Sequence, residues 1–118
     1  MKDISYIKNI RTREILKKVD NKMTEIFKDK LQNVILYGSY ARNENTLESD
    51  IDVMVLVSED EYKIREYEDI ITDVMVDLSL EYEVVISLYT QNVQEYEKQV
   101  KVLPFLINVQ REGINVHG

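Results

Sequence analysis

The chain has 118 residues, 44% of them apolar and 31% charged, which predicts one soluble globular domain over residues 1–118. A net charge of −7 argues against direct nucleic-acid binding, and the lack of cysteine excludes disulfides and thiolate metal sites. The single histidine, His117, argues against a Ser-His-Asp site. Because no apolar run is long enough to span a membrane and the first residues form no secretory segment, we expect a cytoplasmic protein with no membrane partner.

Glycine and proline are rare, so hydrophobic spacing and a few turn residues delimit the elements. Apolar residues recur every three or four positions over 11–30, which predicts a helix with a short helical segment before it at 4–10. The remaining expected elements are, in chain order, strands over 33–37 and 50–57, a helix over 60–81, a strand over 84–89, a helix over 93–100, a helix from Pro104 to Gly113, and a short final strand over 114–116.

This order, α-β-β-α-β-α-α-(β), predicts an α/β (α+β) fold in which helices pack on a small mixed sheet. The loop over 40–49 is short for a crossover connection, so the first two strands are expected to be antiparallel neighbours. The second strand, the long helix and the third strand form a βαβ unit, which is parallel and right-handed. Three segments then meet at one edge of the sheet, namely the end of the first strand and the starts of the second and third.

Two polar groups lie at that edge. Asp50 and Asp52 are two positions apart on a strand, so both side chains leave the same face about 6.6 Å apart. Alone, such a pair is common among solvated turn residues. Here Gly38-Ser39 ends the facing strand, where glycine permits close approach of a ligand and a helical turn would offer free N–H groups to an anion. Two neighbouring carboxylates and a phosphate cradle favour a Mg²⁺-bound polyphosphate ligand.

The spacing from Gly38-Ser39 to Asp50-Ile-Asp52 resembles the G-S-x10-D-x-D signature of the DNA polymerase β-like nucleotidyltransferases. More narrowly, the chain resembles the minimal nucleotidyltransferases (MNT proteins), in which this stretch commonly reads G-S-x-A-R-G followed by S-D-I-D. The element order, the short length and the final sequence R-E-G-I-N-V over 111–116 also fit that family, so the resemblance spans most of the chain.

The resemblance implies the nucleotidyltransferase fold and assigns roles to several residues. Asp50 and Asp52 would be catalytic and would bind two Mg²⁺ ions that hold the triphosphate of the substrate ATP. The residues expected to bind the nucleotide are Gly38, Ser39, Arg42 and Ser49. For Arg42 a surface salt bridge is the alternative interpretation. Tyr40 in the same loop is interpreted as a packing residue, with stacking on a base as the alternative.

The chain departs from the family pattern at two positions. Asn43 replaces the usual glycine after Arg42, a change that asparagine tolerates because it adopts positive φ more readily than other side chains. Family enzymes usually carry a third carboxylate on the third strand, where this chain has apolar residues over 84–86. Glu83 is the nearest acidic residue and is the expected third catalytic carboxylate, with a solvated surface residue as the alternative.

The resemblance implies a Mg²⁺-dependent transfer of AMP from ATP to a hydroxyl acceptor. MNT proteins are commonly paired with a HEPN-domain toxin and act as its antitoxin by adding AMP to a tyrosine. A HEPN partner is therefore expected, and a homo-oligomer is a further possibility. Two alternatives remain open: a catalytically degenerate member that neutralises its partner by binding alone, and an aminoglycoside-type transferase acting on a small molecule.

Overall fold

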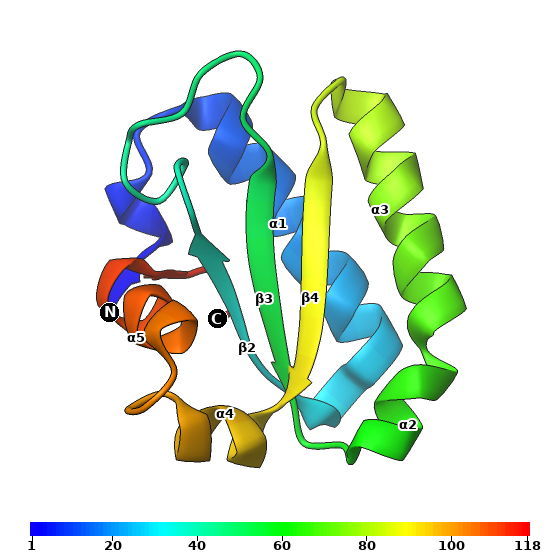
Figure 1. Ribbon diagram of the computed structural model, residues 1–118. Coiled ribbons are helices and arrows are strands. Elements are labelled where there is room, and N and C mark those ends of the chain that lie inside the picture. The colour runs from blue at the N-terminus through cyan, green and yellow to red at the C-terminus, as the bar shows by residue number, and fades with distance from the viewer.

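The computed structural model describes all residues 1–118. Five strands form one sheet, and five α-helices surround it (Figure 1). The elements are, in chain order, β1 (Lys2–Asp3), a 3₁₀ turn (Ile4–Tyr6), α1 (Ile10–Phe27), a 3₁₀ turn (Lys28–Lys30), β2 (Leu31–Tyr37), β3 (Ile51–Val57), α2 (Glu61–Glu66), α3 (Glu68–Tyr82), β4 (Ile86–Asn92), α4 (Val93–Gln99), α5 (Pro104–Glu112) and β5 (Ile114–Asn115).

The sheet is mixed and has the strand order β1-β5-β2-β3-β4. The predicted antiparallel pairing of β2 with β3 and parallel pairing of β3 with β4 are both confirmed. The strand β1 was not predicted; it pairs in parallel with β5, which in turn pairs with β2. The expected helical segment over 4–10 is reduced to the single 3₁₀ turn, because Asp3 caps that turn and the chain is extended again at Ile7.

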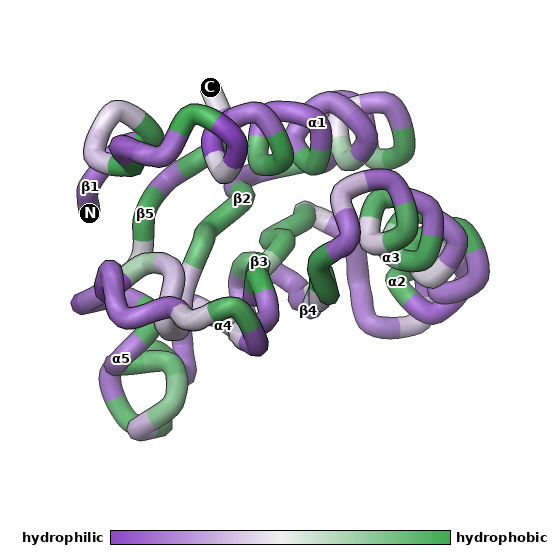
Figure 2. Tube along the Cα trace, turned by 90° about the horizontal axis from the view of Figure 1, so that it is seen from above, coloured by the Kyte–Doolittle hydropathy of each residue, from purple (hydrophilic) through white to green (hydrophobic).

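The two faces of the sheet carry two separate apolar cores. Val53, Val55 and Val57 point to the face covered by α1 and α3, which holds the larger core. Met54 and Leu56 point to the opposite face, where α4 and α5 supply a smaller core. Seen along the sheet, α1 lies on one side of the strands and α4 and α5 lie on the other (Figure 2). Alternation along β3 therefore places both Met54 and the residue two positions earlier, Asp52, on the α4–α5 face.

Capping residues set where the helices begin. Asn9 accepts a hydrogen bond from the Thr12 N–H at 2.9 Å and so starts α1, whose buried stripe includes Leu16 and Met23. Lys28, with φ 54°, ends it.

The prediction of one helix over 60–81 is wrong in its continuity, because the backbone at Tyr67 (φ −94°, ψ −2°) separates α2 from α3. The Tyr67 ring packs on Phe27 with 4.7 Å between ring centroids, so this break also places an aromatic side chain in the core.

The helix α3 covers the free edge of β4. The Ile86 N–H donates to the Ser79 hydroxyl at 3.0 Å, and the Leu88 N–H lies 3.2 Å from the Met75 sulfur. The strand itself begins two residues later than expected, at Ile86 rather than 84, because the left-handed backbone at Glu83 first turns the chain out of α3.

The convergence expected from the sequence is observed. The end of β2 and the starts of β3 and β4 lie toward the upper edge of the sheet in Figure 1; the loop that follows Tyr37 joins β2 to β3, and β4 is entered from α3. The register pairs Asp52 with Tyr37 on one side and with Ser87 on the other. None of the helices combines the length and apolarity needed to cross a lipid bilayer.

Candidate active site

The chain leaves β2 through a tight turn at Gly38, whose backbone has φ +80°. The amide groups of Ala41 and Arg42 donate to the Gly38 carbonyl at 3.0 and 3.2 Å, so the next residues form one helical turn. The Ser39 and Tyr40 N–H groups precede this bonding pattern and donate to no protein group. Asn43 adopts the left-handed conformation (φ 57°) that the family's glycine would supply. Asparagine is therefore accommodated at this position, and the turn offers free N–H groups.

Asp52 lies against this turn. A Cβ placed on Gly38 would be 2.6 Å from Asp52 Oδ2, which shows that the carboxylate occupies the space that a side chain would need. Asp50 lies just before β3 and is exposed, whereas Asp52 is partly buried at the start of the strand. Gly38, Asp50 and Asp52 are thus close neighbours at one edge of the sheet, as the sequence predicted.

The electrostatics of this edge favour a bound cation. Burial raises the pKa of Asp52, and the negative charge of Asp50 raises it further. The same carboxylate acts on its cross-strand neighbour: burial, Asp52 and Tyr89 together raise the pKa of Tyr37 to about 12. Both shifts reflect negative charge that is incompletely solvated, and a divalent cation held by the two aspartates would compensate it.

Asp50, Asp52 and Glu83 form no three-ligand cluster that could hold a metal ion. Glu83 is an exposed residue that caps the C-terminus of α3, outside the sheet. The prediction placed the start of β4 two residues too early, so Glu83 lies before the strand rather than at its first residues. The position beside Asp52 on the same face belongs to Ser87, which has a hydroxyl in place of a carboxylate.

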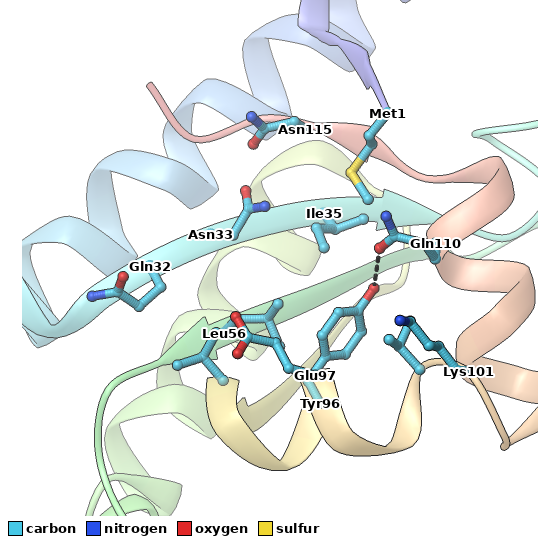
Figure 3. A pocket seen from close by; sticks show the side chains of 12 residues that line it. Met1, Gln32, Asn33, Ile35, Leu56, Tyr96, Glu97, Lys101, Gln110 and Asn115 are labelled. Atoms are coloured by element: carbon cyan, nitrogen blue, oxygen red, sulfur yellow. Dashed lines mark hydrogen bonds between the residues drawn. The ribbon is translucent and has the colours of Figure 1, made fainter.

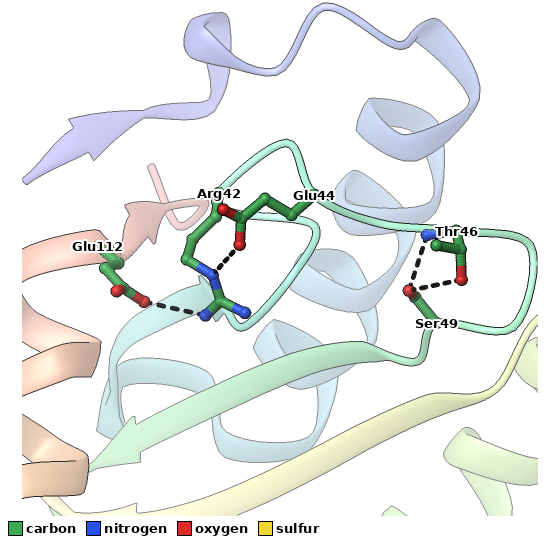
Figure 4. A network of polar contacts seen from close by, with 5 residues as sticks. All are labelled: Arg42, Glu44, Thr46, Ser49 and Glu112. Atoms are coloured by element: carbon green, nitrogen blue, oxygen red, sulfur yellow. Dashed lines mark hydrogen bonds and ion pairs between the residues drawn. The ribbon is translucent and has the colours of Figure 1, made fainter.

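Arg42 and Ser49, both expected near the nucleotide, have protein partners (Figure 4). Arg42 Nε donates to Glu44 Oε1 at 2.7 Å and its Nη1 donates to Glu112 Oε2 at 3.1 Å, so the guanidinium links the turn to the end of α5. This double ion pair raises the pKa of Arg42 above its ordinary value. The Ser49 hydroxyl accepts from the Thr46 N–H at 2.8 Å and so closes the loop just before Asp50.

Two cavities open on the α4–α5 face of the sheet. One has a volume of about 770 Å³ and lies where β2 begins and β3 ends, away from the aspartates. Figure 3 shows Tyr96 in this cavity, with its hydroxyl donating a hydrogen bond to Gln110 Oε1 at 2.8 Å. The other, of about 230 Å³, adjoins the Gly38 turn and is called the α5 cavity. The residues that line the α5 cavity are Tyr37, Gly38, Arg42, Phe105, Asn108, Val109 and Glu112.

Sequence reasoning missed several residues of this site. Tyr37 could have been found, because it directly precedes Gly38 and ends a strand that was predicted. Ser87 would have required the register of β4, which depends on how α3 ends. Phe105 and Glu112 come from α5, and nothing in their local sequence indicates that this helix packs beside the Gly38 turn.

Residues 13–112 match the family described as "Nucleotidyltransferase domain". Among curated proteins, the Methanocaldococcus jannaschii protein named "Putative protein adenylyltransferase MJ0141" is 38% identical over 103 residues, which cover 87% of this chain and 96% of that protein. A second protein of that organism, "Putative protein adenylyltransferase MJ0604", is 31% identical over 83% of this chain and 90% of its own length.

Among solved structures, a chain from the crystal structure of a toxin-antitoxin with AMP-PNP superposes with a TM-score of 0.50 and 21% identity, covering 81% of this chain and 70% of that one. This match shows the shared fold. The family match and the sequence relatives, together with the signature residues gathered at the sheet edge, identify the chain: it belongs to the nucleotidyltransferase domain family and is a nucleotidyltransferase.

Proposed function

We propose that this protein, as one domain over residues 1–118, transfers AMP from ATP to a hydroxyl group of a partner protein. The observation that carries the proposal is the contact between the Gly38 turn and Asp52. It places a turn with free N–H groups, which bind phosphate oxygens, next to the carboxylate of Asp52, which with Asp50 can bind a cation. A nucleoside triphosphate with bound Mg²⁺ is the common ligand that uses both groups together.

The residues present fit Mg²⁺. Asp50 and Asp52 supply the one or two carboxylates by which this ion is usually held beside substrate phosphates, and the raised pKa of Asp52 shows that the pair gains from added positive charge. Bound there as one or two ions, Mg²⁺ would neutralise the triphosphate and the departing pyrophosphate.

The chain's own groups orient the reactants. The Ser39 and Tyr40 N–H groups and the Ser39 hydroxyl donate to the terminal phosphates, and Arg42 adds its Nη2 donors, which its two carboxylate partners leave free. The acceptor hydroxyl attacks the α-phosphorus, and pyrophosphate leaves. Ser49 fixes the loop that precedes Asp50 rather than touching the nucleotide.

A tyrosine of a HEPN-domain toxin is the proposed acceptor, and the reaction would take place in the cytoplasm, where ATP is available. The resemblance to MNT proteins supports this pairing. Two sequence relatives named as protein adenylyltransferases support a protein acceptor over a small molecule, and the related fold found in a toxin-antitoxin structure agrees with it.

One observation favours a second candidate function. Ser87 stands beside Asp52 where a third carboxylate would complete the cluster, and Glu83 does not replace it. A protein that binds its partner and Mg-ATP without transferring AMP would need only the two aspartates and the turn.

The deciding experiment combines the protein, Mg²⁺, α-labelled ATP and the HEPN-domain protein encoded by a neighbouring gene. Adenylyl transfer predicts label on a tyrosine of the partner, lost with Asp52→Asn and retained with Asp73→Asn, an exposed aspartate of α3 that serves as the matched control. A stable complex without label would establish the binding-only alternative. Absence of both Mg-ATP binding and label would contradict both candidates.

A further inference from the structure

The α5 cavity adjoins the Gly38 turn, and Gly38 belongs to both. Gly38 lines it on one side, and α5 forms its opposite wall through Phe105 and Asn108. Its volume of about 230 Å³ is smaller than the roughly 300–1,000 Å³ of pockets that enclose a whole drug-sized ligand. The cavity therefore has room for one part of a ligand whose remainder extends past Gly38.

The charges around the α5 cavity do not suit a phosphate group. Arg42 is the cation at its rim, and the carboxylates of Glu44 and Glu112 offset its charge, which leaves only its Nη2 to reach a phosphate at the Gly38 turn. The protein as a whole carries a net charge of −7. A triphosphate would find its donors at the Gly38 turn and its cation at the aspartates, whereas the part that enters the cavity should be uncharged.

The walls of the α5 cavity suit a flat ring with polar edges. The Phe105 side chain is 50% exposed and meets the Tyr37 ring edge to face, with 5.5 Å between centroids and a 79° interplanar angle. Exposed aromatic rings of this kind stack on nucleobases. Asn108 Oδ1 accepts from Arg111 Nη2 at 2.5 Å, which leaves the Asn108 amide nitrogen as a donor without a partner. Glu112 uses Oε2 for Arg42 and keeps Oε1 as an acceptor.

We propose that the α5 cavity holds the nucleobase of the donor nucleotide, with the base against Phe105 and its edge bonded to Asn108 and Glu112. The inference rests on the proposed function, because it takes the phosphates to lie at the Gly38 turn. One free donor beside one free acceptor matches adenine, which presents an exocyclic amino group next to a ring nitrogen acceptor. Guanine presents an acceptor oxygen where adenine has its amino group, so Glu112 disfavours it.

The test compares the Kd of Mg-ATP with that of Mg-tripolyphosphate, which has the phosphates and no base, by isothermal titration calorimetry. Phe105→Ala should weaken Mg-ATP binding about 5- to 150-fold, the range for loss of one base–aromatic stack, and leave Mg-tripolyphosphate unchanged. Ile107→Ala is the matched control, since Ile107 lies on the same helix, is partly exposed and does not line the cavity. Phe105→Leu keeps the apolar contact with Tyr37 and should still lose most of the affinity for Mg-ATP.

Base selectivity gives a second readout. The wild-type protein should prefer ATP to GTP, and Asn108→Ala should reduce the ratio of their Kd values about two- to tenfold, as expected for one hydrogen bond. Equal weakening of Mg-ATP and Mg-tripolyphosphate by Phe105→Ala, or no change in either, would overturn the inference. Weakened binding of the acceptor protein with unchanged Mg-ATP affinity would also overturn it, because the cavity would then hold an acceptor side chain.

The outcomes separate this inference from the proposed function. If the wild-type protein binds Mg-ATP and Phe105→Ala binds it equally well, only the placement of the base is wrong. If the wild-type protein binds neither Mg-ATP nor Mg-tripolyphosphate, the proposed function fails and the nucleobase site fails with it.

Discussion

The carboxylate of Asp52 fills the space beside Gly38 that any side chain at position 38 would need: a Cβ there would be 2.6 Å from Oδ2. The backbone of Gly38 is also left-handed, with φ +80°. The clash of a Cβ with Asp52 and the left-handed backbone therefore each require glycine where the Gly38 turn meets the carboxylate pair.

Replacing this glycine should damage both stability and nucleotide binding. We expect Gly38→Ala to lower the free energy of unfolding by about 1–2 kcal/mol through backbone strain and to weaken Mg-ATP binding by displacing the Asp52 carboxylate. Urea denaturation and calorimetry measure the two effects. Gly118→Ala is the control: its φ is also positive, at +149°, but it is the last residue, so its backbone can relax, and no atom lies within 4 Å of a Cβ placed there. Wild-type affinity in Gly38→Ala would contradict the proposed geometry.

The raised pKa of Asp52 predicts a specific dependence of stability on pH. Since the folded state binds the Asp52 proton more tightly than the unfolded state, the free energy of unfolding decreases as the pH rises from the ordinary pKa of 3.8 through the folded value. Asp52→Asn removes this decrease, so the variant should gain stability relative to wild type as the pH goes from about 4 to 7.

Urea denaturation across that pH range measures the difference. Asp73→Asn, at an exposed position on α3, should follow wild type. Mg²⁺ at neutral pH should raise the Tm of wild type and not that of Asp52→Asn. Parallel pH profiles for wild type and Asp52→Asn would show that the carboxylate is not destabilised in the folded protein.

Tyr37 should be the last of the eight tyrosines to ionise. Its pKa of about 12, raised by burial and then by Asp52, keeps the phenol protonated in the folded protein after an ordinary tyrosine has ionised near 10. The free energy of unfolding should therefore fall as the pH rises from 10 to 12. Phenolate absorbance follows the titration: Tyr37→Phe should remove the highest step, and Asp52→Asn should lower its pKa. If all eight tyrosines of the folded protein have ionised by pH 11, the predicted rise in the pKa of Tyr37 is wrong.

Ser87 offers a way to complete the carboxylate cluster. Ser87→Asp places a third negative charge beside Asp52, so without metal it should lower the free energy of unfolding by up to about 1 kcal/mol, the cost of like charges on facing strands. Mg²⁺ should reverse this loss and raise the Tm by more than it does in wild type. Glu83→Gln should leave the metal response unchanged, because Glu83 lies outside the site. An equal Mg²⁺ effect in Ser87→Asp and wild type would place Ser87 away from the ion.

The sequence predicts those parts of the structure that depend on local sequence patterns, such as apolar runs and short loops. Apolar runs located β2 and β3, and the short loop between them was enough to make them antiparallel. The Gly-Ser to Asp-Ile-Asp spacing located the turn and the acids, since each lies at a strand end whose position was known. Asn43 was expected to tolerate a left-handed backbone, and it adopts one.

The errors arose where tertiary contacts decide. Packing of Tyr67 on Phe27 accompanies the break in the predicted 60–81 helix, and a single stripe of apolar residues gives no sign of it. The left-handed cap at Glu83 delays β4 by two residues, so the register that places Ser87 beside Asp52 could not be read from the sequence. The strand β1 has two residues and exists only because β5 pairs with it, so no periodicity could reveal it.

Because α3 covers the outer edge of β4, another protein chain cannot readily bind there by adding a strand to the sheet. The Ser79 hydroxyl and the Met75 sulfur already meet two outward-facing N–H groups of β4, and the opposite border of the sheet ends in the two residues of β1. Two donors along the edge of β4 are thus already engaged, which disfavours the addition of a strand from another chain. We therefore expect complexes of this protein to form through side chains of helices and loops, and the same cover over β4 to disfavour strand-to-strand fibre growth.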